Sequence, residues 1–281
     1  MSFATGKRIV VTGANSGIGF ETARLLSSFG AEVIMVCRNR NRGEAARQAI
    51  LHRDPDADLT LFIADLSSKR STADLITEIR RNYTSLHVLV NNAGALLHER
   101  KTTEDGLEYT FALNHMGPFR LTLGLMDLLQ AGAPSRVITI SSEGHRFSKI
   151  STPAEIEQLI NPLDYRGFTS YCNSKLANIL FTRELARRYG KNGISAVSLH
   201  PGFVRTDFGN LKNSPFSAKL FSLMMRLCAV SPEHGAATPV HLADSESITN
   251  GMYYAKKKLK KPSAAARSDN LAAALWGIST E

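Results

Sequence analysis

Short apolar runs rich in β-branched residues alternate with longer amphipathic stretches along most of this 281-residue chain. The runs at 8–11, 32–37, 59–64, 87–91, 136–141 and 194–200 are predicted strands, with a short seventh at 252–254. Segments of helical period lie between them, among them 17–29, 71–83, 107–129 and 170–189. Near-continuous apolar strands separated by helices predict a parallel sheet that is covered on both faces. We therefore expect an α/β fold with a doubly wound parallel sheet of about seven strands, binding its ligands at the carboxyl ends of the strands.

Two long irregular stretches, 143–169 and 207–230, each come after a predicted strand. Long loops in compact domains are often functional lids, so both are predicted substrate loops. The second loop holds the apolar residues Phe216, Leu220, Phe221, Leu223, Met224 and Met225, which fit a substrate wall and a piece of core equally well. No Pro-, Gly- or Ser-rich linker and no internal repeat divides the chain, so residues 1–281 are expected to form a single domain.

The formal net charge of +9 is typical of proteins that bind nucleic acid or acidic membranes, but the basic residues are mostly dispersed. The one dense run, 256–261, lacks the interleaved aromatic side chains of a single-strand groove. We interpret it as a solvated loop and expect no nucleic-acid partner. The three cysteines form no CxxC pair and no signal-peptide pattern is present, which indicates a cytoplasmic setting. No apolar run approaches the roughly 18 residues of a transmembrane segment, so none is expected.

Three glycines stand in the stretch TGANSGIG at 12–19, between the first predicted strand and the first predicted helix. In a dinucleotide-binding loop Gly13 would permit the turn, Gly17 would let a pyrophosphate approach, and Gly19 would let helix and strand pack closely. The helix N-terminus adds free N–H groups and a positive dipole for the phosphates. Glycine spacing alone also fits a purely structural turn.

Further motifs follow this loop: NNAG at 91–94, Asn114 in LNHMG, a Ser141–Ser142 pair, Tyr171-x-x-x-Lys175 and HPGFVRT at 200–206. In this order and spacing the set resembles the short-chain dehydrogenase/reductase family over about residues 7–255. The stretches CRNRNRGEAA, NNAGAL and YCNSKLANILFTRELARRY are similar to its retinol dehydrogenase and WW-domain oxidoreductase branch. The resemblance implies a Rossmann-type fold and a nicotinamide-dependent oxidoreductase. We find neither a WW domain nor the membrane anchor of many retinol dehydrogenases, so the substrate is not carried over.

Tyr171 and Lys175 lie four residues apart on a predicted helix and therefore share one face. A tyrosine hydroxyl has a pKa of about 10, which a neighbouring ammonium lowers toward the working range. The resemblance implies that Tyr171 is the general acid for carbonyl reduction and the base for alcohol oxidation, while Lys175 also holds the nicotinamide ribose. It implies that Ser142, with Ser141 as its rival, binds the substrate oxygen. Asn114 would anchor a water of the proton relay, or would merely mark a bent helix.

The second predicted strand ends at Arg38 and Asn39, without the carboxylate that binds the 2′-hydroxyl in NAD-specific members. The Arg38 guanidinium, assisted by Arg42, would grip a 2′-phosphate with paired donors, so NADP(H) is favoured over NAD(H). The alternative is that these arginines are surface charge. The resemblance implies these further cofactor contacts: Gly13, Asn15, Ser16, Gly17, Ile18, Gly19, Asp65, Leu66, Asn91, Asn92, Ala93, Gly94, Tyr171, Lys175, Pro201, Gly202, Val204 and Thr206. No histidine spacing such as HxxxH indicates a metal.

The leading hypothesis is an NADP(H)-dependent oxidoreductase that interconverts a carbonyl and an alcohol on a small apolar substrate. One alternative is a retinoid- or steroid-type alcohol dehydrogenase that works oxidatively. The other is a non-catalytic NADP-binding sensor or scaffold, which the complete set Asn114, Ser142, Tyr171 and Lys175 argues against. Many members of the family form dimers or tetramers through the helices that carry Asn114 and Tyr171, so a homodimer or homotetramer is a further expectation.

Overall fold

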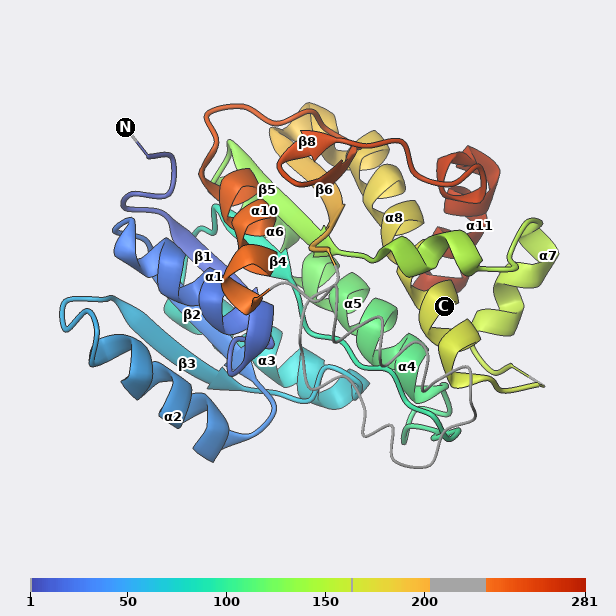
Figure 1. The fold of residues 1–281 in the computed structure, drawn as a ribbon, viewed down its shortest axis with the longest axis horizontal. Helices are drawn as coiled ribbons and strands as arrows, with labels where there is room; N and C mark the ends of the chain where they lie inside the picture. Colours follow the sequence, from blue (N-terminus) through green and yellow to red (C-terminus); the bar gives the residue numbers. More distant parts are fainter. Residues whose placement is uncertain (1, 163, 203–230) are drawn as a thin grey trace.

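An eight-stranded sheet runs through the molecule in the order β3-β2-β1-β4-β5-β6-β7-β8 (Figure 1). The computed structural model describes residues 2–162, 164–202 and 231–281. Its strands are β1 (Arg8–Thr12), β2 (Glu32–Cys37), β3 (Leu59–Ile63), β4 (Val88–Asn91), β5 (Ser135–Ile140), β6 (Ile194–His200), β7 (Tyr253–Ala255) and β8 (Lys258–Leu259). All neighbours pair in parallel except β7 and β8, which are antiparallel. The doubly wound sheet is confirmed, with each predicted strand within one residue of its observed bounds and with β8 added.

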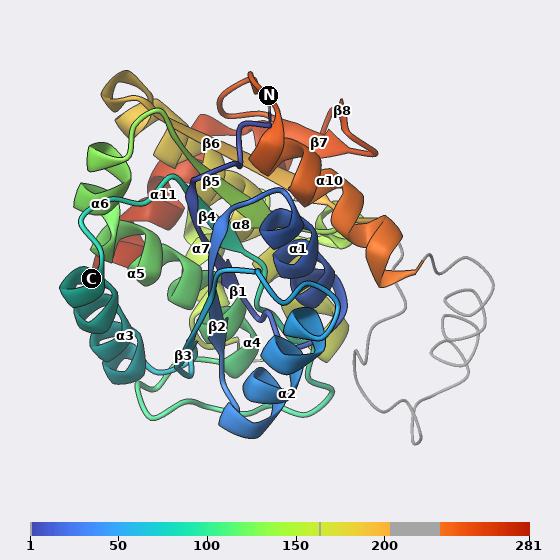
Figure 2. The same ribbon diagram turned by 90° about the vertical axis from the view of Figure 1, so that its left-hand side faces the viewer.

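Successive strand residues enter opposite layers of the core, as the two-residue period of a strand requires. In β1, Ile9 and Val11 pack in one apolar cluster and Val10 packs in the other. Helices α1 (Gly17–Ser28), α2 (Arg40–Leu51) and α10 (Pro232–Asp244) cover the first face. Helices α3 (Lys69–Asn82), α8 (Gly167–Tyr189) and α11 (Asp269–Thr280) are among those that cover the second (Figure 2).

The segment predicted as one helix at 107–129 is helical but irregular. It consists of α4 (Tyr109–Phe111), the π-helical turn η1 (Ala112–Met116), α5 (Gly117–Gly124) and α6 (Met126–Ala131). The wide turn η1 contains Asn114, whose side chain bonds outside the helix. π-Turns inside helices are frequent at functional sites.

The first predicted loop, 143–169, is more regular than expected. It contains η2 (Glu143–Phe147), α7 (Pro153–Ile156) and η3 (Glu157–Leu159), and α8 already begins at Gly167. Short 3-10 turns also follow α8, as η4 (Gly190–Asn192), and precede α11, as η6 (Ala265–Arg267). The second predicted loop, 207–230, with its apolar residues Phe216 to Met225, lies outside the described residues.

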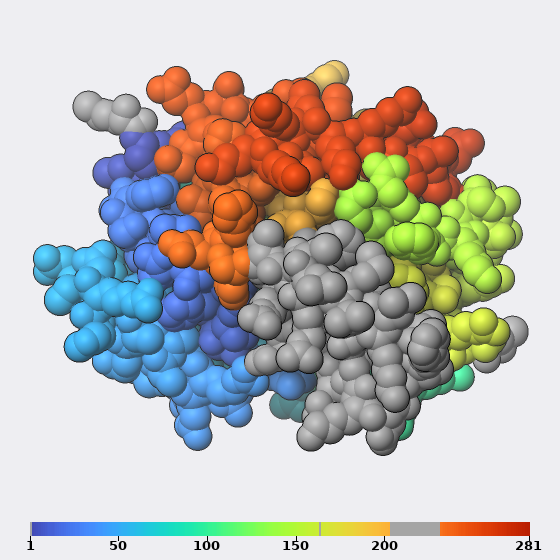
Figure 3. Space-filling view, in the orientation of Figure 1, coloured from blue at the N-terminus to red at the C-terminus, as the bar shows by residue number. Residues whose placement is uncertain are grey.

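The basic run 256–261 contains a β-hairpin turn and strand β8, rather than a plain solvated loop. Lys256 and Lys257 have φ angles of 48° and 63°, and Ala255 pairs with Lys258 across the two-residue turn. The lysine side chains are exposed, as expected. In the space-filling view, the segment after the hairpin lies at the surface beside the segment that follows β5 (Figure 3). None of the helices in the described ranges combines the length and the apolar character that crossing a membrane requires.

Candidate active site

The motif residues gather at the carboxyl ends of β1, β4, β5 and β6, beside α8. The chain continues from β1 toward β2 on one side and returns to β4 on the other, so the strand order reverses between β1 and β4. In open α/β sheets, ligands bind in the crevice at such a switch point. The glycine loop follows β1 directly at this place, and NNAG begins with the last residue of β4.

The glycine loop and NNAG form one structural unit. Gly13 and Gly17 have φ angles of 66° and 57°, in the left-handed region that favours glycine. The Asn92 amide donates to the Thr12 carbonyl at 2.7 Å and so clamps the turn. A Cβ atom on Gly19 would lie 2.3 Å from the Gly13 carbonyl oxygen and 2.4 Å from Asn92 Nδ2. Each of the three glycines is therefore required by the backbone itself.

The N-terminus of α1 is suited to a phosphate group. Ser16 precedes the helix and is exposed, but its side chain makes no capping hydrogen bond, and the first turn carries no acidic residue. Helix N-termini have N–H groups without intrahelical partners and a positive partial charge. Asn15 Nδ2 lies 3.4 Å from Ser16 Oγ, whereas Ile18 is buried in the core below. The geometry therefore fits a dinucleotide pyrophosphate.

Lys175 is a buried cation with donors to spare. The residue is 3% exposed, and its Nζ donates to the Ile140 carbonyl oxygen at 3.0 Å. An ammonium has three N–H donors, and in the described part of the chain Ile140 is its one hydrogen-bond acceptor. Burial lowers the pKa of Lys175 to about 8. Two donors are thus available for the hydroxyl groups of a ribose.

Tyr171 lies one helical turn before Lys175, and Lys175 Nζ is 5.6 Å from the centre of its ring. Burial raises the pKa of Tyr171 to about 12, and a hydrogen bond with the Ser142 side chain partly offsets this rise. The predicted lowering of this pKa by Lys175 is therefore not seen, because burial has the larger effect, and the phenol is protonated at neutral pH. That is the form a general acid needs before it gives its proton to a carbonyl oxygen.

The two serines after β5 have different surroundings. Ser141 is buried, and its Oγ donates to the Lys175 main-chain carbonyl at 2.7 Å, which ties β5 to α8. Ser142 is partly exposed; its Oγ accepts a hydrogen bond from the Gly144 N–H at 3.1 Å and also bonds Tyr171. Ser141 thus fixes β5 to α8, and the role of Ser142 as the serine that binds the substrate oxygen stays a prediction.

Asn114 joins three elements of the site. Its Oδ1 accepts from the Ala95 N–H at 2.7 Å, and its Nδ2 donates to the Ala95 carbonyl and to Ser174 Oγ, both at 2.9 Å. A Cβ atom on Gly94 would lie 3.1 Å from Asn114 Oδ1 and 3.4 Å from Lys175 Nζ, so the glycine keeps this corner open. The side chain fixes the loop after β4 against η1 and α8. The water-anchoring role of Asn114 stays a prediction.

Arg38 lies exposed at the end of β2, where a 2′-phosphate was predicted to bind. Its Nη1 donates to the Tyr109 hydroxyl at 2.5 Å, so a residue from α4 orients the guanidinium. Sequence reasoning missed Tyr109, because the two residues are far apart in the chain and no motif joins them. Asn39 caps α2, with its Oδ1 accepting from the Arg42 N–H at 3.0 Å, and its predicted cofactor contact stays a prediction.

Asp65 and Leu66 form the turn after β3. Asp65 Oδ1 accepts from the N–H and the hydroxyl of Ser67, at 2.9 and 2.6 Å, and Leu66 is buried in the core. Their predicted cofactor contacts stay predictions. At the other end of the site Gly202 has a φ of 90° after Pro201, whereas Val204 and Thr206 lie outside the described residues. The histidine, cysteine and carboxylate side chains of residues 2–162, 164–202 and 231–281 form no group of three suited to a metal.

Known proteins resemble this chain in both sequence and fold. The family model described as short chain dehydrogenase matches residues 7–154 and 162–215. The chain is 38% identical over 281 residues to the WW domain-containing oxidoreductase of Gallus gallus, covering 98% of this chain and 67% of that protein. It is 38% identical over 287 residues to retinol dehydrogenase 14 of Mus musculus, covering 98% and 85%. A crystal structure of an uncharacterized protein from Mycobacterium Paratuberculosis matches with a TM-score of 0.77 at 29% identity, covering 98% of this chain and 92% of that one.

Proposed function

The chain belongs to the short chain dehydrogenase family, and on that premise we propose that it is an NADP(H)-dependent oxidoreductase. Its reaction interconverts a carbonyl and an alcohol on a small apolar substrate. The observation that carries the proposal is the contact between Tyr171 and Ser142 beside the buried Lys175 ammonium. The Tyr171 phenol, the Ser142 hydroxyl and the Lys175 ammonium thus lie together near the carboxyl ends of the strands.

In the proposed reaction, side chains of the protein carry out the proton transfer. In reduction, Tyr171 gives its phenolic proton to the substrate oxygen as that oxygen becomes a hydroxyl group, and in oxidation it takes the proton back. Ser142 donates a hydrogen bond to the same oxygen and steadies its developing charge. Lys175 stabilises the phenolate through its positive charge and holds the ribose hydroxyls with its two remaining donors. The nicotinamide, when bound, supplies or accepts the hydride.

The preference for NADP(H) rests on the adenosine end of the groove. Arg38 is the first residue after β2 and is held by the Tyr109 hydroxyl, with no carboxylate beside it on β2 to repel a 2′-phosphate. A guanidinium binds phosphate with paired, charge-assisted hydrogen bonds. The uncapped N-terminus of α1 would bind the pyrophosphate of the same molecule.

The oxidative alternative is a dehydrogenase of a retinoid-type or steroid-type alcohol. It is favoured by one observation, the relative named retinol dehydrogenase 14. Since the same Tyr171 serves both directions, the two candidates differ in substrate and direction rather than in machinery.

The test is cofactor oxidation and reduction followed by absorbance, with NADPH against NADH, over a panel of aldehydes, ketones, quinones and alcohols. We expect turnover with NADPH to exceed that with NADH. Tyr171→Phe should lower kcat by about 10²–10⁴-fold and leave NADPH affinity nearly unchanged, since the proton and not the ring is used.

The matched control is Tyr189→Phe, because Tyr189 lies at the end of the same helix and contacts Trp276 through its ring. Wild-type activity in this control would show that removing a hydroxyl from α8 does no general harm. A Tyr171→Phe enzyme with more than about a tenth of wild-type kcat would refute the assignment of the general acid.

A further inference from the structure

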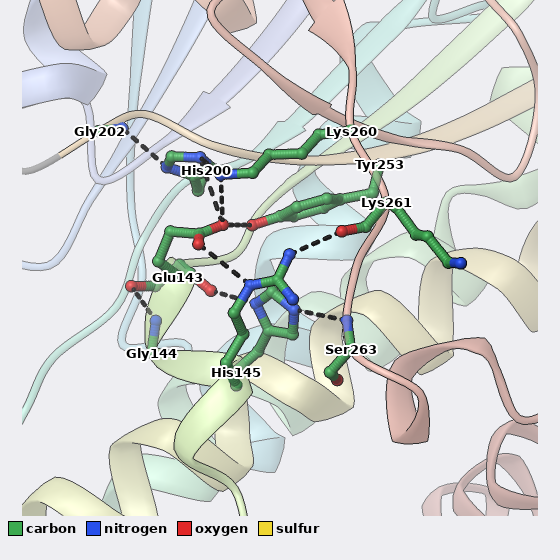
Figure 4. Close-up of polar contacts among 11 residues, drawn as sticks. Glu143, Gly144, His145, His200, Gly202, Tyr253, Lys260, Lys261 and Ser263 are labelled. Atoms are coloured by element: carbon green, nitrogen blue, oxygen red, sulfur yellow. Dashed lines mark hydrogen bonds and ion pairs between the residues drawn. The ribbon is translucent and has the colours of Figure 1, made fainter.

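A second polar cluster includes the residues that directly follow Ser142 in the chain (Figure 4). We name it the Glu143 cluster and define it as Glu143, His145, Arg146, His200, Tyr253 and Lys260. Its members come from η2, from the end of β6, from β7 and from the residue after β8. The predicted catalytic and cofactor residues include none of them.

Glu143 is the centre of the cluster. Lys260 Nζ at 3.0 Å and the Tyr253 hydroxyl at 3.2 Å donate to its Oε1, and His200 Nε2 lies 3.4 Å from the same oxygen. Its Oε2 accepts from Arg146 Nε at 3.1 Å. Partial burial raises the pKa of Glu143, but the hydrogen bond from Lys260 and the surrounding positive charge outweigh that effect and lower it to about 2.

The protonation of His200 follows from its partners. Its Nδ1 accepts a hydrogen bond from the Gly202 N–H at 3.1 Å, and a main-chain N–H can only donate. A neutral imidazole has one protonated nitrogen, so Nε2 carries the hydrogen, 3.4 Å from Glu143 Oε1. Lys260 Nζ lies 3.3 Å from Nε2 and is closer, at 3.0 Å, to Glu143 Oε1, to which it donates. Burial lowers the pKa of His200 to about 4, so this neutral form persists at neutral pH.

Gly202 belongs to the turn that resembles the nicotinamide-binding turn of the family, and Glu143 directly follows Ser142. We propose that His200 and Glu143 are positioning residues that lock the Pro201–Gly202 turn to the segment carrying Ser142. The inference rests on the proposed function, in which that turn and Ser142 serve the hydride and the proton. The lock would keep the turn that binds the nicotinamide at a fixed distance from Ser142, which binds the substrate oxygen.

The neighbouring contacts brace the same pair of segments. His145 Nδ1 donates to the Ser142 carbonyl oxygen at 2.6 Å, because its Nε2 accepts from the Ser263 N–H at 3.1 Å. The Tyr253 ring packs edge-on to His145 at 5.2 Å and is stacked with His200 at 5.9 Å. One aromatic ring thus supports the histidine that holds Ser142 and the histidine that holds Gly202.

Two substitutions of His200 separate the lock from simple packing. An asparagine oxygen readily accepts from the N–H two residues on, so His200→Asn keeps the Gly202 contact while its shorter side chain loses Glu143. His200→Leu loses both contacts. We expect His200→Leu to lower kcat by about 10–10²-fold, the scale of a misplaced reacting group, and His200→Asn to lower it less. NADPH affinity should change less than about threefold in both, because the adenosine and pyrophosphate contacts are distant.

The control is His52→Leu, which removes an exposed histidine at the end of α2 and should leave all parameters unchanged. Should His200→Leu fail to fold, Glu143→Gln is the second variant, since it keeps the shape and removes the charge. It should lower kcat with little change in NADPH affinity. A kcat within about twofold of wild type in His200→Leu, or in Glu143→Gln where that variant replaces it, would overturn the lock. The same result in His200→Asn, which has lost the link to Glu143, would also overturn it.

Two readouts need no turnover. Nitrogen NMR of His200 should show hydrogen on Nε2, and amide exchange at Gly202 should quicken in Glu143→Gln; hydrogen on Nδ1 or unchanged exchange would refute the lock. If the wild type reduces no carbonyl with NADPH, the proposed function fails, and these two measurements still decide whether the lock exists.

Discussion

Gly19 offers a sharp test of the view that the glycine loop is set by the backbone. In Gly19→Ala the added methyl group would lie 2.3 Å from the Gly13 carbonyl oxygen and 2.4 Å from Asn92 Nδ2, whereas real Cβ contacts essentially never fall below 3.0 Å. The turn or the Asn92 amide must therefore move by about 0.7 Å, the difference between 3.0 and 2.3 Å. Both are held already, since Asn92 donates to the Thr12 carbonyl.

The expected magnitude follows from two opposing effects. Alanine in a helix stabilises by about 0.5–1 kcal/mol relative to glycine, and overpacking costs about 1–3 kcal/mol. Because the neighbours of Gly19 are backbone and a bonded amide, the cost should dominate, with a net loss of about 1–2 kcal/mol. The displaced group forms the turn at the N-terminus of α1, so NADPH binding should weaken about tenfold, which corresponds to about 1.4 kcal/mol.

Urea unfolding and a fluorescence titration with NADPH measure the two quantities. Gly277→Ala is the matched control, because Gly277 lies in α11 and its Cβ would meet nothing within 4 Å. This control should be stabilised by about 0.5–1 kcal/mol through helix propensity alone. A Gly19→Ala protein that gains stability as the control does, with unchanged NADPH affinity, would refute the steric account of the loop.

Three other outcomes are expected. Arg38→Asp should shift the preference for NADPH over NADH by at least about tenfold, because charged hydrogen bonds are lost and a repulsive carboxylate is added. The KM values for both cofactors at low and high salt measure this shift. An unchanged preference would contradict the assignment of Arg38. Ser142→Ala should lower kcat with little loss of stability. Ser141→Ala should lower the unfolding free energy by about 1 kcal/mol, because the hydrogen bond from Ser141 to the main chain of α8 is lost. The reverse pattern would exchange the roles of the two serines. Burial lowers the pKa of His115 to about 3. Below about pH 6.5 the unfolded chain therefore takes up a proton at His115 that the folded chain does not. The unfolding free energy then falls by up to about 1.4 kcal/mol per pH unit as the pH is lowered. His115→Gln should lose less stability than wild type between pH 7 and 5 in urea titrations, and equal losses would count against that linkage.

The strands were predictable because their apolar runs are short, β-branched and bounded by turns. The helix at 107–129 was predictable as a helix, but its period gave no sign of the π-turn η1. That turn depends on bonds from Asn114 to Ala95 and Ser174, which lie elsewhere in the chain. The hairpin at Lys256 and Lys257 was missed because two lysines are not the glycine or asparagine that such turns usually carry.

Some residues of the candidate site were likewise predictable from the sequence, and others were not. Motif spacing predicted Tyr171, Lys175 and Ser142, because these residues recur at fixed positions on a strand end and a helix. Contacts between remote segments had no local signal: Arg38 meets Tyr109, and Glu143 meets Lys260, only after the sheet has formed. His200 stands in the quoted HPG motif, yet its role depends on the tautomer that its neighbours impose.

The short hairpin at the end of the sheet also affects how copies of the protein meet. A sheet edge offers unpaired N–H and C=O groups to any passing strand and so invites aggregation. Here the last strand, β8, has two residues, Lys258 and Leu259, both exposed, and the turn before it adds two more lysines. A strand from a second molecule would gain few hydrogen bonds on β8 and would bring like charges together. The short, lysine-rich edge therefore disfavours the addition of a further strand at this end of the sheet.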